Sequence, residues 1–107
     1  MKSIIIHEFM IKDLYLSGVK LLLYALIYSF TQFGQGFFVS DKVVCSFLHI
    51  SRSQYFAAKK SLIDRQLVVC DPKSNKLYCA RCVMDEDLNN EELAEAIRLA
   101  RLNLYYD

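Results

Sequence analysis

The sequence predicts a mostly helical α+β fold, in which three helices form the core, a β-hairpin follows them, and one further helix ends the chain. Apolar residues recur at helical spacing in several segments, and two β-rich runs flank a turn rich in proline, serine and asparagine. Glycine and proline together number only four, which is typical of a compact chain. A length of 107 residues, 54% of them hydrophobic, suits one domain with a single modest core.

The first long helix is expected to be central and buried. An apolar run at residues 3–10 precedes it, as an edge strand or a lead-in. Ser17 is the expected N-cap, and from Val19 to Phe30 apolar residues recur at helical spacing, with further apolar residues on the other faces. A helix that is apolar nearly all round belongs in a core.

Two shorter helices are expected to follow, each with its own start signal. Ser40 caps the first of them, and Asp41 in its first turn suits the positive end of a helix. Ser51 and Gln54 form a capping box that starts the second. This helix ends at Gln66, where a left-handed conformation would cost glutamine about 1 kcal/mol relative to glycine.

The rest of the chain divides into a hairpin and a charged helix. We expect the hairpin to complete a domain at residues 1–83, which carries eleven lysines and arginines against five acids. Residues 84–107 carry two arginines against seven acids and form an acidic C-terminal helix with an apolar stripe. The stripe either folds back onto the same domain or, as we expect, pairs with a second chain through these residues: Leu93, Ile97, Ala100 and Leu104.

The expected elements follow the order of a winged helix-turn-helix: helix, helix, tight turn, capped helix and hairpin. In that fold the helix after the tight turn enters the major groove of DNA. The segments LSGVKLLLYALIYSF and HISRSQYFAAKKSLIDRQLV, together with the hairpin, resemble the winged helix-turn-helix domains of bacterial, plasmid and phage replication initiators and of related transcription regulators. The resemblance covers roughly residues 10–83. It implies a small regulator or initiator module that binds double-stranded DNA in a sequence-specific way, as a homodimer or a larger assembly. A cytoplasmic location is expected separately, because no secretory signal is visible in the sequence.

The residues expected to contact DNA come from the capped helix and from the hairpin turn. Arg52 is the candidate for a bidentate contact to guanine, Phe56 for contact with a thymine methyl group, and the turn lysines for phosphates. Positions 56 and 57 are commonly polar or basic in the family, but here they are Phe and Ala, which depart from the pattern. The full set of expected DNA contacts is Ser51, Arg52, Ser53, Gln54, Phe56, Lys59, Lys60, Lys73, Asn75 and Lys76.

Two other interpretations of this helix stay open. In the first, the charged residues of the helix, Arg65 included, form an ordinary solvated face with no partner. In the second, the fold is a winged helix that does not bind DNA, and Phe56 docks a protein partner. Salt dependence separates the last of these from DNA binding, because phosphate contacts weaken steeply with salt.

The four cysteines raise the possibility of a metal- or redox-responsive regulator. Cys79 and Cys82 form a CxxC, and Cys70 with His49 or Cys45 would complete a zinc site. We expect no metal, because residues 76–83 look like a strand, in which side chains three apart point to opposite faces. We also expect no redox role for the CxxC, because no thioredoxin-like helix start follows it.

Other function classes find no support in the sequence. The longest apolar stretch has 12 residues and includes Lys20, so no membrane span is expected. No catalytic motif occurs, and we expect no enzyme activity, no cofactor and no small-molecule substrate.

Overall fold

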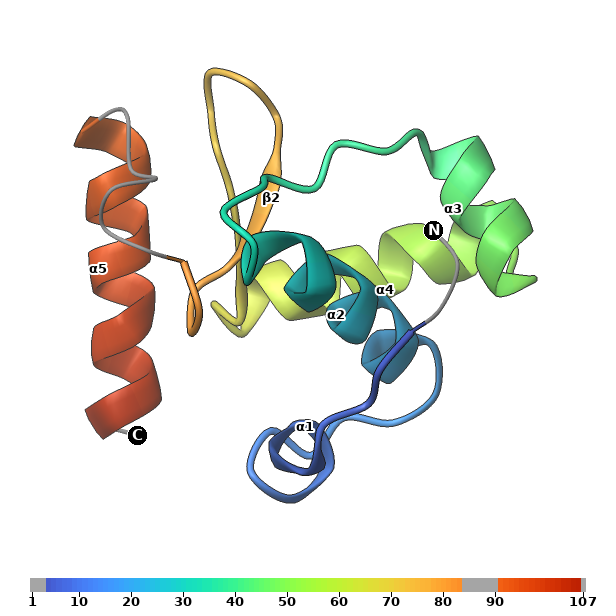
Figure 1. Cartoon of the computed structure of the whole chain (residues 1–107), viewed down its shortest axis with the longest axis horizontal. Coiled ribbons are helices and arrows are strands. Elements are labelled where there is room, and N and C mark those ends of the chain that lie inside the picture. Colours follow the sequence, from blue (N-terminus) through green and yellow to red (C-terminus); the bar gives the residue numbers. More distant parts are fainter. Residues whose placement is uncertain (1–3, 84–90, 107) are drawn as a thin grey trace.

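The chain folds as an α+β protein that is mostly helical, as expected (Figure 1). The structure is a computed structural model that describes residues 4–83 and 91–106, and side chains only as far as Leu102 in the last helix. Within these ranges the elements are α1 (Glu8–Lys12), α2 (Gly18–Thr31), α3 (Asp41–Leu48), α4 (Arg52–Asp64), β1 (Val68–Cys70), β2 (Leu77–Cys79) and α5 (Glu91–Tyr106).

The N-terminal apolar run is a lead-in and not a strand. Residues 4–7 are irregular, and α1 begins at Glu8, with Met10 fully buried in the main core. A strand there would need an edge to pair with. The described sheet has only β1, β2 and a single bridge, and none of these pairs with residues 4–7.

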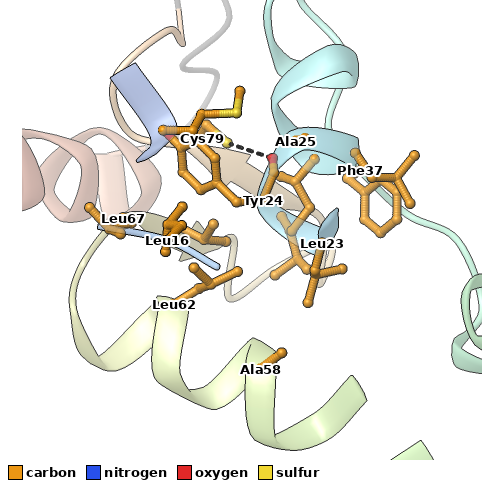
Figure 2. Close-up of a cluster of buried hydrophobic side chains, with 14 of the residues drawn as sticks. Leu16, Leu23, Tyr24, Ala25, Phe37, Ala58, Leu62, Leu67 and Cys79 are labelled. Atoms are coloured by element: carbon orange, nitrogen blue, oxygen red, sulfur yellow. Dashed lines mark hydrogen bonds between the residues drawn. The ribbon is translucent and has the colours of Figure 1, made fainter. Parts of the chain in front are cut away.

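Helix α2 is the central helix that the sequence predicts. Five consecutive residues, 23–27, are buried, and the helix packs against α4 and β2. Figure 2 shows side chains from α2, α4, β2 and the loops converging on this core, among them Leu23, Leu62 and Leu67. Buried Thr31 joins two elements, because its Oγ1 donates to the Ile27 carbonyl at 2.9 Å and accepts the Cys79 amide at 3.1 Å.

Helices α3 and α4 begin where their cap residues predict. Ser40 Oγ accepts the amide of Val43 at 3.3 Å, and Ser51 and Gln54 form a complete capping box. Between the helices, His49 takes a left-handed conformation with φ of +56°, and the Ile50 amide donates to the Cys45 carbonyl at 3.0 Å. This tight turn fixes the angle at which α4 leaves α3.

The hairpin forms as expected, with shorter strands. Val69 pairs with Tyr78 at the centre of the antiparallel ladder, and Phe37 adds an isolated bridge to Leu77 on the other side of β2. The chain enters β1 through Gln66, whose φ of +59° is the left-handed conformation considered from the sequence.

The expectation that residues 76–83 form one strand is wrong at its C-terminal half. Strand β2 ends at Cys79, and Ala80, Arg81 and Cys82 form a turn in which the Cys82 amide donates to the Cys79 carbonyl at 3.3 Å. Arg101 of α5 holds this turn, because its Nε donates to the Ala80 carbonyl at 2.9 Å. The alternation argument therefore does not apply to the two cysteines.

The apolar stripe of α5 is covered by the chain's own hairpin and not left open for a second copy. Leu93, Ile97 and Ala100 are each 1% exposed and pack against a second apolar cluster that the hairpin supplies. Figure 1 shows α5 beside the hairpin, on the opposite side of the molecule from α3. These three residues are thus not the dimer interface expected from the sequence, and the side chain of Leu104 lies outside the described residues.

Candidate nucleic-acid interface

The first turn of α4 is exposed, and its own cap holds it in shape. Ser51 Oγ accepts the Gln54 amide at 3.1 Å, and Gln54 Oε1 accepts the Ser51 amide at 2.9 Å. Arg52 and Ser53 lie between them and are both exposed. Because amide groups and the helix dipole make this end of a helix positive, the turn is suited to an anionic group such as a phosphate.

Arg52 reaches a neighbouring helix instead of standing free. Its guanidinium lies 2.9 Å from the Asp41 carboxylate of α3, while its side chain stays 74% exposed. The same guanidinium lies 5.8 Å from the centre of the Phe56 ring. Exposed ion pairs of this kind contribute only about 0–1 kcal/mol, so DNA can compete for the arginine at small cost.

The two lysines of α4 differ in their surroundings. Lys60 forms an ion pair with Asp64 at 2.8 Å, and this hydrogen bond raises the pKa of Lys60. Lys59 is partly buried and lines a groove next to Phe56. Arg65 is exposed, but its guanidinium donates to the Leu14 carbonyl at 2.6 Å and ties the end of α4 to the loop after α1.

The hairpin turn presents two exposed lysines on a frame of hydrogen bonds centred on Asp71. Asp71 is 5% exposed, and its carboxylate accepts the Lys73 amide at 3.0 Å and the Ser74 hydroxyl at 2.8 Å. Its own amide donates to the Lys76 carbonyl at 2.8 Å. Asn75 takes a left-handed φ of +61°, which asparagine tolerates better than most residues. The frame leaves the side chains of Lys73 and Lys76 in solvent.

A groove of about 340 Å³ lies between α4 and the hairpin. Tyr55, Phe56 and Lys59 line it from α4, and Asn75 and Leu77 from the hairpin. The loop before α3 and Asp41, the first residue of α3, supply the rest of the wall. Phe38 in that loop is 68% exposed and Phe56 is 46% exposed. The structure therefore brings three of the expected contact residues, from two separate elements, to one hollow.

Three residues of this region were not expected to take part in the site. Asp41 was expected only in the first turn of a helix, and the expected DNA contacts include neither Asp71 nor Phe38. A signal for Asp71 exists, since an Asp followed by Pro, Lys, Ser and Asn is typical of a turn in which the aspartate accepts backbone hydrogen bonds. Nothing local marks the pairing of Asp41 with Arg52, because the two residues belong to different helices.

Comparison of the chain with protein-family models, with characterised proteins and with solved structures gives no match. Within the described ranges, no three histidines, cysteines or acids cluster in a way that would hold a metal ion. None of the described helices is long and apolar enough to cross a membrane.

Proposed function

We propose that residues 10–83 form a winged helix-turn-helix that binds double-stranded DNA, with α4 in the major groove and the hairpin turn on the sugar-phosphate backbone. The order of elements supports the fold: α2, the bridge at Phe37, α3, α4, β1 and β2 follow one another as the helices and strands of a winged helix do. The chain then serves as a small regulator or as the DNA-binding module of a replication initiator.

The observation that carries the proposal is that α4 and the hairpin turn border one groove. Phe56 and Lys59 share it with Asn75, so a duplex that seats α4 in its major groove would meet the turn at the same time. Lys73 and Lys76 would then reach phosphates, which position a protein without reading sequence. Arg52 and Phe56, both exposed in the first half of α4, would supply the sequence reading.

The test is a fluorescence anisotropy titration with a random-sequence duplex at two salt concentrations. If two lysines neutralise two phosphates, the slope of log affinity against log salt should change by nearly two when both Lys73 and Lys76 are replaced by alanine. The double variant Lys12→Ala, Lys20→Ala is the matched control, since it removes the same two charges from exposed positions in α1 and α2, outside the proposed interface. A wild-type affinity that does not change with salt would refute the proposal.

A second function, the docking of a protein partner without DNA, is favoured by one observation. Two exposed phenylalanines, Phe38 and Phe56, border a groove, while Arg52 and Lys60 are already paired with carboxylates of the same chain. An apolar docking site would bind with little dependence on salt. The same titration therefore separates the two functions, because only DNA binding predicts a steep slope.

A further inference from the structure

The turn at residues 79–82 brings two cysteines together in a conformation that permits a disulfide. The Cys82 amide donates to the Cys79 carbonyl at 3.3 Å, which closes a four-residue turn. The Cα atoms at the two ends of such a turn lie within about 7 Å of each other. Disulfides need a Cα separation of about 4.4–6.8 Å, so the backbone is already close to the required geometry.

The two thiols have different surroundings. Cys79 is completely buried, and its Sγ donates to the Tyr24 carbonyl at 3.9 Å (Figure 2). Cys82 is partly exposed, and its Sγ lies 3.9 Å from the Cys79 carbonyl. Solvent therefore reaches Cys82, whereas Cys79 is closed off from it.

The electrostatic surroundings favour a thiolate at the exposed position. A hydrogen bond with the Cys79 thiol, and next the charge of Arg101, lower the pKa of Cys82. Burial raises the pKa of Cys79, and so does its contact with the Cys82 thiol. An accessible thiolate beside a second thiol is the arrangement found in reversible thiol oxidation.

We propose that Cys79 and Cys82 are a thiol oxidation site that forms a reversible intrachain disulfide on reaction with hydrogen peroxide or an organic hydroperoxide. The Cys82 thiolate attacks one peroxide oxygen, the O–O bond breaks, and the other oxygen leaves as water or an alcohol, which gives a sulfenic acid. The Cys79 thiol then attacks that sulfur, the S–O bond breaks, and water leaves as the S–S bond forms. A dithiol reverses the reaction by exchange and is itself oxidised.

The oxidation site lies at the point where the last helix is attached. Arg101 donates to the Ala80 carbonyl, inside the turn, and to the Val83 carbonyl just after it. A bond between the two sulfurs tightens the turn from which these carbonyls project. The redox state of the cysteines is thereby coupled to the packing of α5 on the hairpin.

Peptide mapping of the full chain tests the proposal directly. The reduced protein is treated with a small excess of hydrogen peroxide, alkylated and digested with trypsin, which cuts after Arg81, between the two cysteines. We expect residues 77–81 and 82–98 to be recovered as one linked species that is two hydrogens lighter than the two free peptides together, and that separates on reduction. Recovery of both peptides fully alkylated, or of Cys82 as sulfinic acid beside a free Cys79, would overturn the proposal.

Two variants identify the attacking sulfur. Cys79→Ser should stop the reaction at a Cys82 sulfenic acid that a dimedone probe labels, whereas Cys82→Ser should leave neither product. Cys70→Ser is the matched control, because Cys70 is also partly exposed and lies in the same hairpin, while its Sγ donates to the Asp71 carbonyl at 3.8 Å and not to a group of the 79–82 turn. If Cys70→Ser abolishes the linked peptides, the disulfide is between other residues and the assignment fails.

Discussion

Asp41 holds the arginine on which sequence-specific reading would depend, so removing its charge should strengthen DNA binding. Asp41→Asn keeps an oxygen that can accept the Lys42 amide, which now donates to the aspartate at 2.9 Å. It removes the ion pair with Arg52, whose nitrogen lies 2.9 Å from the carboxylate. Arg52 is then free to contact phosphate or guanine.

The size of the effect follows from the exposure of the pair. Two unit charges about 4 Å apart attract by about 1 kcal/mol in water, and measured exposed pairs contribute about 0–1 kcal/mol. Asp41 is the less exposed partner, with 31% of its side chain accessible, so we expect the upper part of this range. Affinity for duplex DNA should rise by up to about fivefold, and the salt slope should steepen by about 0.9 for one additional phosphate contact.

Anisotropy titrations against one duplex at about 50 and 200 mM salt measure both quantities. Arg52→Ala should weaken specific binding by about 1–3 kcal/mol. In the Arg52→Ala protein, Asp41→Asn should raise DNA affinity less than it does in the wild type, because no arginine remains to be released. Glu8→Gln is the matched control, since it breaks an exposed ion pair of 2.8 Å in α1 and changes the net charge equally.

One result would refute this reasoning. If Asp41→Asn leaves affinity unchanged or lowers it while Arg52→Ala still weakens binding, then the carboxylate orients the arginine for DNA and does not compete for it. A modest loss of stability is expected in either case, because the charge of Asp41 at the first turn of α3 contributes about 0.3–1 kcal/mol.

Three further predictions concern the fold and the reading of bases. Gln66→Gly should raise the free energy of unfolding by about 1 kcal/mol in urea titrations, since φ is +59° there, whereas Asn75→Gly, at +61°, should gain less because asparagine tolerates this conformation. Ile97→Ala should lower the free energy of unfolding by about 2–5 kcal/mol, because the side chain is 1% exposed and packs against the hairpin. Leu99→Ala should lower it far less, because Leu99 is 45% exposed. Equal effects would contradict the packing of α5. Poly(dA)·poly(dT) should bind more tightly than poly(dA)·poly(dU), which lacks only the thymine methyl, and Phe56→Ala should remove the difference; a preference that survives the substitution would exclude Phe56 as its source.

The sequence by itself determined the features that depend on near neighbours along the chain. Ser40 and the Ser51–Gln54 box start α3 and α4 because their side chains reach amides three residues away. The hairpin follows from two β-rich runs around a turn, and the left-handed Gln66 from the need to end α4 and enter β1. Each of these is decided within one helical turn or one β-turn.

Tertiary structure alone decided what covers each face. Periodicity identified an apolar stripe on α5, but a stripe carries no information on whether its cover is another chain or, as here, the hairpin. The Arg52–Asp41 pair and the clamp of Arg101 on the 79–82 turn join residues of separate elements. Strand β2 ends at Cys79, opposite Val68 at the start of β1, and one more hydrogen bond, from the Ala80 amide to the Leu67 carbonyl at 3.2 Å, follows before Arg101 of α5 holds the chain in its turn.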